Sequence, residues 1–253
     1  MSVTHSPSKE KNMASDKITV GFLSPMGATG DHFDRFSRFV PEEVTLEVGG
    51  LDLIEGPLNS MEGKEGLATD LSVRSISDNP GWQTAAILAA PVQVYMPNLA
   101  PNVRGQVAIP VTTAMESAVA ALSALGASRV LLMTPFDESM NVQIRAFLAE
   151  RDVEAISGPQ PAPYYRDAAK LGPDEVYSIT KEGLVNAGAV DAIYFQGAVL
   201  DALEIIDRLE SELGLPVVAS NPAMLWHALS LLGHSFSVPN GGRLLREWPA
   251  LKK

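Results

Sequence analysis

Residues 109–134 read IPVTTAMESAVAALSALGASRVLLMT and place a strand, a helix and a second strand in direct succession. Thr113 and Glu116 have the spacing of a capping box, in which each side chain satisfies the backbone N–H of the other residue. Hydrophobic residues then recur at the helical period as far as Leu125, and Gly126 is suited to end the helix in the left-handed conformation. This unit predicts two parallel strands joined by a right-handed crossover.

The same alternation continues on both sides of this stretch. We expect further strands over 18–23, 92–96, 153–157, 191–196 and 216–220, and helices over 82–90, 137–150, 199–213, 222–232 and between Pro173 and Gly188. Strands that alternate with helices of about a dozen residues predict an α/β fold with mostly parallel sheets. Residues 49–80 have no clear period, and fit a long loop, a lid or a helix that the pattern does not reveal.

The chain also contains an internal repeat. The strand and helix that end at Gly126 resemble those that end at Gly233, about 107 residues later. We therefore expect two pseudosymmetric lobes, the first formed by 18–125 with 221–246 and the second by 126–220, after a disordered leader over 1–17. The carboxyl ends of equivalent strands would face each other, and the crevice between them is where α/β proteins bind ligands.

Composition excludes several classes of chemistry. The 253 residues contain no cysteine and four histidines, so a thiol nucleophile, a disulfide and an iron–sulfur cluster are excluded, and we expect no metal site and no cofactor. The net charge of −11 argues against nucleic acid and anionic membranes as partners. No apolar run reaches the roughly 20 residues of a membrane span, and 1–17 lack the apolar stretch of a signal peptide, so we expect a cytoplasmic protein.

Several segments together resemble a known family. The sequence is similar over most of 18–246 to the maleate isomerase and arylmalonate decarboxylase branch of the aspartate/glutamate racemase superfamily. The segments that carry the resemblance are PVVASNPAMLWHALSLLG (216–233), GGRLL (241–245), Thr112 and Thr113 with the helix that follows them to Gly126, RVLLMTPF (129–136) with Asn141, PDEV (173–176) and DAI (191–193). The resemblance implies two Rossmann-like lobes, a small carboxylate substrate between them, no cofactor and a homodimer.

The sequence departs from this family at its reactive positions. The isomerases and racemases use one cysteine on each lobe, and the decarboxylases keep only the second. We place the second at Gly197 and the first at the end of the strand 92–96, where the sequence has Met96, Pro97 and Asn98. A tyrosine common in relatives is Phe136 here. Thiol-dependent racemisation and isomerisation are therefore not available to these residues.

Backbone donors and a few side chains remain as candidates. The turn at 196–198 precedes an expected helix and favours a carboxylate or an oxyanion, and residues 24–30 form a second small-residue loop. We expect the substrate-binding residues to be Ser24, Met26, Gly27, Asn98, Thr134, Phe136, Gln196, Gly197 and Ala198.

Two residues are candidates for the catalytic acid or base. His32 follows the first loop and carries an imidazole, with a surface or capping role as the alternative. Tyr95 alternates with Val94 and Met96 along the expected strand and is a candidate acid in the pocket, with packing in the core as the alternative. We expect His227 on a solvated helix face, Asn221 as an N-cap, Glu116 as a capping partner, and Tyr164 with Tyr165 in a turn or over the site.

Three functional hypotheses follow from these residues. The first is a thiol-independent lyase, similar to a decarboxylase, acting on a small carboxylate or dicarboxylate through an enediolate held by backbone donors. The second is a cis–trans isomerase or racemase that uses other acid and base groups. The third is a catalytically silent protein that binds a carboxylate.

Overall fold

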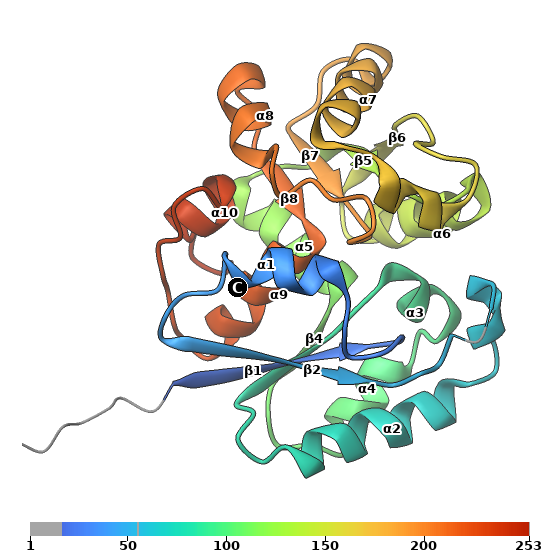
Figure 1. The fold of residues 1–253 in the computed structure, drawn as a ribbon, viewed down its shortest axis with the longest axis vertical. Helices are drawn as coiled ribbons and strands as arrows, with labels where there is room; N and C mark the ends of the chain where they lie inside the picture. The colour runs from blue at the N-terminus through green and yellow to red at the C-terminus, as the bar shows by residue number, and fades with distance from the viewer. Residues whose placement is uncertain (1–16, 55, 253) are drawn as a thin grey trace, which may run out of the picture.

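The computed structural model describes residues 17–54 and 56–252 and contains two parallel sheets. The first is four-stranded in the order β2-β1-β3-β4, and the second is four-stranded in the order β6-β5-β7-β8, so both have the same topology. This confirms the α/β fold with two similar sheets (Figure 1). The strands are β1 Ile18–Ser24, β2 Val44–Gly50, β3 Thr84–Ile87, β4 Val111–Thr113, β5 Arg129–Met133, β6 Glu154–Ser157, β7 Ala192–Phe195 and β8 Val217–Ala219.

Helices cover both sheets and connect their strands. They are α1 Asp31–Ser37, α2 Glu65–Asp78, α3 Ala90–Tyr95, α4 Leu99–Arg104, α5 Ala114–Leu125, α6 Glu138–Ala149, α7 Pro173–Ala187, α8 Ile206–Leu213, α9 Ser220–Leu231 and α10 Gly242–Glu247, with short 3-10 helices at Leu58–Met61 and Tyr165–Lys170. At the start of α5, Thr113 Oγ1 accepts a hydrogen bond from the Glu116 N–H at 3.1 Å. Gly126 ends α5 with φ of 74°, as expected.

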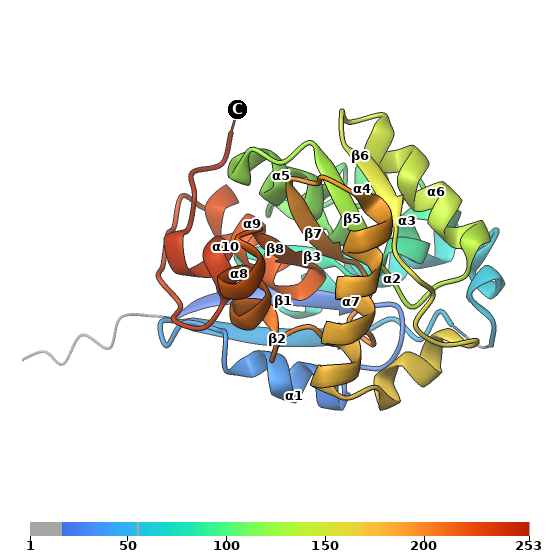
Figure 2. The same ribbon diagram turned by 90° about the horizontal axis from the view of Figure 1, so that it is seen from above.

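The lobes are joined through α5 and α9. These two helices pack against each other, and α9 also packs on β1, β3 and β4 of the first sheet although it follows β8 of the second. One core cluster accordingly runs through both lobes, whereas a second lies under α2 and α4, on the far side of the first sheet (Figures 1 and 2). The return of α9 to the first lobe was expected, and the lobe boundaries remain a prediction.

Two expected elements are exchanged in the structure. The segment expected as a helix over 82–90 contains β3, and the segment expected as a strand over 92–96 is α3. All four residues of β3 are buried, because this strand lies between β1 and β4. Its small residues suit that close packing, which overrides the helix propensity of alanine. A run as short as 92–96 carries too few residues for its period to separate a helix from a strand.

Three further boundaries differ from expectation. Residues 49–80 contain the end of β2 and the 14-residue helix α2. The helix expected from 199 begins only at Ile206, and the strand expected at the start of the stretch 109–134 begins at Val111. The leader expected over 1–17 lies outside the described residues except for Lys17.

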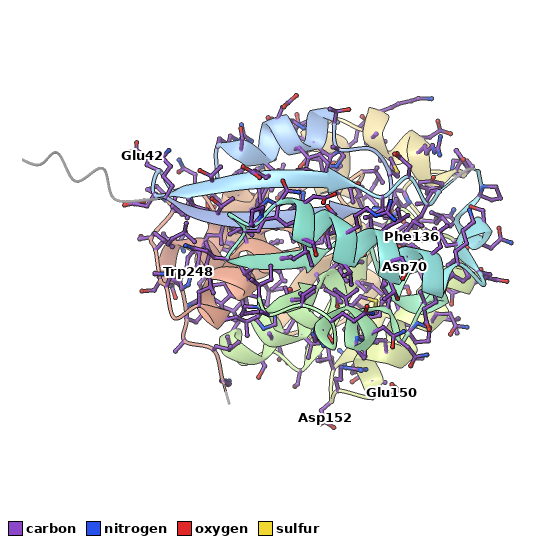
Figure 3. The ribbon with its side chains drawn as sticks, turned by 90° about the horizontal axis from the view of Figure 1, so that it is seen from below. Glu42, Asp70, Phe136, Glu150, Asp152 and Trp248 are labelled. Carbon is purple, nitrogen blue, oxygen red and sulfur yellow. The ribbon has the colours of Figure 1, made fainter. Side chains whose placement is uncertain are left out.

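The buried core consists mainly of apolar side chains, whereas charged residues lie on the surface. Glu42, Asp70, Glu150 and Asp152 are exposed, with Glu42 at one edge of the molecule and Glu150 and Asp152 together at another (Figure 3). Within 17–54 and 56–252, no helix has both the length and the hydrophobicity needed to span a membrane. The same residues contain no group of three or more His, Asp or Glu side chains that could hold a metal ion.

Candidate functional site

A cavity of about 100 Å³ lies between the two sheets, where strands from both lobes end. The loop after β1, the residues after β3 and the start of α1 form its first side. The residues after β5 and β7 and the first turn of α9 form its second side. The lining residues are Ser24, Pro25, Met26, Gly27, Thr29, His32, Ile54, Leu58, Leu88, Ala89, Pro91, Phe136, Tyr165, Gln196, Gly197, Ala198, Val199, Ser220, Asn221 and Met224.

The loop after β1 is held in place by its own hydrogen bonds. The buried Ser24 Oγ accepts from the Met26 N–H at 3.3 Å, and the Pro25 carbonyl accepts from the Leu53 N–H at 2.8 Å. Ser24, Met26 and Gly27 all line the cavity. The structure thus brings this predicted loop to the site.

The segment after β7 forms the opposite wall. Gln196 is 1% exposed, and its backbone N–H still pairs with the Met133 carbonyl at 2.9 Å. Gly197 follows with φ of 107°, a conformation that side-chain-bearing residues rarely adopt. Gln196, Gly197 and Ala198 all line the cavity, as the sequence suggested.

The position equivalent to Gly197 in the first lobe is Ala89. Gly197 stands two residues after β7, and Ala89 stands two residues after β3 with φ of 73°. The turn that corresponds to Gly197 in the first lobe therefore lies at the end of β3, whereas Met96, Pro97 and Asn98 follow the helix α3 rather than a strand. Asn98 is exposed at the start of α4, where its backbone N–H donates to Glu65 Oε2 at 2.9 Å. The structure does not bring Asn98 to the cavity.

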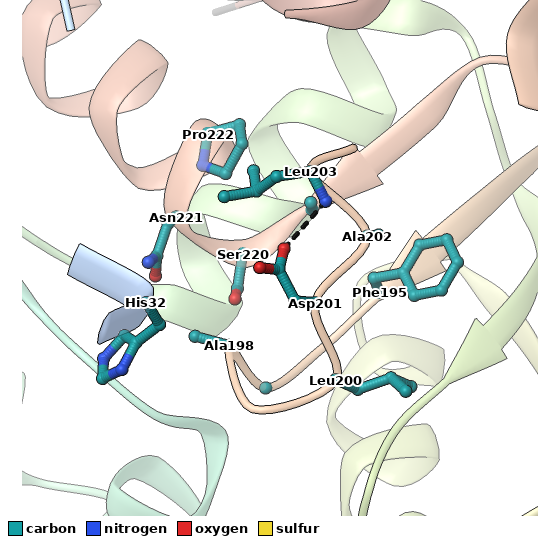
Figure 4. Close-up of a pocket in the computed structure, with 12 residues that line it drawn as sticks. His32, Phe195, Ala198, Leu200, Asp201, Ala202, Leu203, Ser220, Asn221 and Pro222 are labelled. Carbon is teal, nitrogen blue, oxygen red and sulfur yellow. Dashed lines mark hydrogen bonds between the residues drawn. The ribbon is translucent and has the colours of Figure 1, made fainter. Parts of the chain in front are cut away.

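Ser220 and Asn221 lie in the first turn of α9 and were missed as site residues. Asn221 is not an N-cap as expected, because α9 begins at Ser220, two residues before the expected start at 222, and its cap residue is Ala219. Both side chains are buried and line the cavity. Figure 4 shows them around a small neighbouring pocket with His32 and Ala198. The apolar period of α9 did not indicate their role, because both residues precede the hydrophobic residues that define this period.

His32 is placed by α1 at the junction of the two lobes. It lines both the main cavity and the small pocket in Figure 4. Nearby, Arg35 of α1 forms an ion pair with Asp201 of the second lobe at 2.6 Å, and Asp201 also accepts from the Leu203 N–H at 2.9 Å. These contacts hold α1 against the segment that follows β7.

A second cavity of about 290 Å³ adjoins the first and shares Leu58, Phe136 and Tyr165 with it. Tyr95 lines this second cavity and not the first. Burial raises the pKa of Tyr95, and the negative charges of Glu62 and Asp137 raise it further. The phenol is therefore a hydrogen-bond donor at neutral pH rather than a base.

Thr134 shapes the turn after β5 without lining either cavity. Its hydroxyl donates to Asn141 Oδ1 at 2.6 Å and accepts from the Phe136 N–H at 3.2 Å. Thr134 thus holds Phe136, which lines both cavities, in position.

His227 is not on a solvated face as expected. Its Nδ1 lies 2.8 Å from Thr112 Oγ1 and 3.2 Å from Ser117 Oγ, between α9, β4 and α5. Burial lowers the pKa of His227 to about 4, so the ring is neutral at pH 7. It does not line the interlobe cavity.

Glu116 forms only half of the expected capping box. Its backbone N–H donates to Thr113 Oγ1, but its carboxylate forms an ion pair with Arg104.

The chemistry of the main cavity is that of neutral donors on an apolar surface. The described residues that line it include no lysine or arginine. Its polar groups are hydroxyls, amides, one imidazole and backbone N–H groups, among them those at the start of the 12-residue helix α9. Such a site can bind a carboxylate through hydrogen bonds from neutral donors, without a positively charged side chain to balance its charge.

Known proteins share this fold and part of this sequence. The chain is 30% identical over 147 residues to arylmalonate decarboxylase from Bordetella bronchiseptica, a match that spans 55% of this chain and 59% of that relative. A crystal structure of arylmalonate decarboxylase has a TM-score of 0.76 at 23% identity, over 90% of this chain and 99% of the other. The maleate isomerase Iso from Pseudomonas putida has a TM-score of 0.75 at 17% identity, over 91% and 99%.

These likenesses extend to a family model. The model described as arylmalonate decarboxylase matches residues 93–245, from α3 to α10. The matched region includes the β7 turn and the first turn of α9 that form one wall of the cavity, so the chain belongs to the arylmalonate decarboxylase family.

Proposed function

We propose that this protein is a thiol-independent decarboxylase that acts on a small malonate-type dicarboxylate in the interlobe cavity. The observation that carries this proposal is the lining itself, in which neutral donors lie at the strand ends beside an apolar wall. The decarboxylase relative supports the reaction class. The absence of cysteine from the chain makes the thiol chemistry of other relatives unavailable.

An apolar cavity favours loss of CO2 on physical grounds. A carboxylate that loses its hydration is raised in free energy, whereas neutral CO2 is not. The bond from Cα to the leaving carboxylate breaks, and its electron pair moves onto Cα and the retained carboxylate to give an enediolate. The N–H groups of the 197–198 turn and of the first turn of α9 would stabilise that negative charge.

The carbanion must then take one proton at Cα, and His32 is the candidate donor. It lines the cavity, and histidine is the side chain that most often transfers protons in enzymes. Tyr95 lies in the adjoining cavity and is therefore the less direct donor.

We expect His32→Gln to lower kcat by roughly 10²- to 10⁴-fold while carboxylate binding changes little. The measurement is CO2 release from phenylmalonate, with binding followed separately by calorimetry. His234→Gln on the exposed surface is the matched control and should leave both unchanged. An unchanged kcat in the His32 variant would remove this residue from the mechanism.

The proposal is tested by incubating the protein with malonate, phenylmalonate and maleate in deuterated water. Release of CO2 with one deuterium on Cα supports it. Conversion of maleate to fumarate without CO2 would instead establish the isomerase hypothesis. Binding without any turnover would identify a silent carboxylate-binding protein.

A further inference from the structure

Among the described residues, Ser60, Ser72 and Gln196 each have a buried side-chain polar atom without a hydrogen-bond partner, and of these three Gln196 lines the interlobe cavity. It stands directly after β7, is 1% exposed and lines the interlobe cavity. Its Nε2 atom is buried and has no hydrogen-bond partner among the described residues. Native proteins seldom leave a buried donor unpaired, because it has lost its water without gaining a partner. The missing acceptor is therefore expected from a ligand.

A neighbouring phenol fixes which way this amide points. Tyr194 lies two residues earlier on the same face of β7, and its hydroxyl donates a hydrogen bond to Gln196 Oε1. Complete burial raises the pKa of Tyr194 far above neutrality, so the phenol keeps its proton and remains a donor. With Oε1 held by Tyr194, the free end of the amide is the NH2 group.

The surroundings of Gln196 indicate what this NH2 group binds. Gly197, Ala198, Ser220 and Asn221 line the same cavity, and they belong to the β7 turn and the first turn of α9. All of these groups offer N–H or O–H donors to an anion, and no cationic side chain lines the described part of the cavity. A carboxylate oxygen is the acceptor that fits a neutral amide donor in such a place.

We propose that Gln196 Nε2 binds the carboxylate that the substrate retains, and that Tyr194 is a positioning residue that orients this amide toward the ligand. This inference rests on the proposed function in one respect, namely that the ligand is a carboxylate. It goes beyond the proposed function because it names the side chain, Gln196, that binds the retained carboxylate of the substrate. We call this residue the anchor. Tyr194 touches no ligand itself and acts only through Gln196.

The first test measures carboxylate binding without turnover. Calorimetry with phenylacetate, the monocarboxylate left when phenylmalonate loses CO2, compares the wild-type protein with Gln196→Met. We expect the variant to bind phenylacetate at least roughly tenfold more weakly, as expected when a hydrogen bond to a charged group is lost. Its melting temperature should stay near that of the wild type, because the methionine fills the same space without an unpaired donor. Gln143→Met on the exposed face of α6 is the matched control.

The second test isolates the role of Tyr194 by a double-mutant cycle. Tyr194→Phe alone should weaken phenylacetate binding severalfold, because the amide can then turn its oxygen toward the carboxylate. In the Gln196→Met background the same change should leave binding unaffected. Tyr177→Phe, a buried tyrosine of α7 outside the cavity, is the control for loss of a buried hydroxyl. Additive effects of the two substitutions on binding would overturn the positioning role.

The outcomes separate this inference from the proposed function. Binding that depends on Gln196 in a protein that releases no CO2 would support the anchor and reject the decarboxylase. Turnover of phenylmalonate with an unchanged KM in Gln196→Met would support the decarboxylase and overturn the anchor. Failure of the wild-type protein to bind phenylacetate, malonate or phenylmalonate would overturn both.

Discussion

Gly197 is the residue at which the sequence resemblance places the second cysteine of the thiol-dependent enzymes. Its φ of 107° is unfavourable for any side chain. An added Cβ would lie 2.9 Å from Pro135 Cδ and 3.3 Å from Phe136 Cζ. The turn after β5 thus occupies the space that a thiol at this position would need. Chemistry at this site has to come from other groups that line the cavity, among them the amide of the adjoining Gln196.

At this residue we predict that Gly197→Cys lowers the free energy of unfolding by about 1–3 kcal/mol, because the backbone conformation is strained for a side chain. The measurement is urea unfolding at pH 7. Gly66→Ala in α2, where an added Cβ meets nothing within 4 Å, is the control and should be neutral or stabilising. A Gly197→Cys protein as stable as the wild type would contradict the steric argument.

Among the helices, α8 supports one wall of the site through the carboxylate of Glu210. Glu210 is 7% exposed and accepts from the Val217 N–H at 2.9 Å and from the Arg243 N–H at 2.7 Å. It therefore ties α8 to the start of β8 and to the first turn of α10. Because β8 leads directly into Ser220 and Asn221, the same contact supports one wall of the cavity.

We predict that Glu210→Ala destabilises the protein by about 3 kcal/mol, since the buried Val217 N–H and the partly buried Arg243 N–H lose a charged acceptor. Urea unfolding measures this loss, and the exposed Glu182→Ala on α7 should stay within about 0.5 kcal/mol of the wild type. Equal stability of the two variants would show that water replaces the carboxylate at no cost.

For the whole molecule, His227 is a polar contact between α9 and the β4–α5 unit of the first lobe. It stands on α9, which follows the second sheet, and it contacts Thr112 and Ser117 of the first lobe. Burial lowers its pKa from 6.5 to about 4. Between these values the unfolded chain binds a proton that the folded protein does not, so stability falls as the pH decreases from 6.5 toward 4.

We predict a loss of up to roughly 3 kcal/mol from this group across that window, on the basis of 1.36 kcal/mol for each pKa unit. Urea unfolding at pH 7 and pH 5 measures the part of it that develops by pH 5. His227→Gln cannot titrate there, so its stability should change less between the two pH values than that of the wild type. An equal change in both proteins would assign the pH dependence to other groups.

Much of the architecture follows from local patterns. The capping residue Thr113, the apolar period up to Leu125 and the terminal Gly126 predicted α5 almost to the residue, and the repeat predicted two similar sheets. The exchange of β3 and α3 shows where local patterns fail. Thr84–Ile87 is a strand because β1 and β4 pair with it on both sides, and those pairings join residues far apart in the chain.

The features of the site also fall into those that the sequence predicts and those that only the tertiary structure shows. The sequence by itself determined the absence of a thiol, the small-residue turns at 24–30 and 196–198, and the polar residue Gln196 at a strand end, because these are properties of residue type and order. Only the tertiary structure decided that Asn98 lies outside the cavity, that Ser220 and Asn221 lie inside it, and that Tyr194 holds one end of the Gln196 amide. The physical reason is that the cavity forms where two sheets and α9 meet. A contact between such distant segments depends on packing that no local pattern contains.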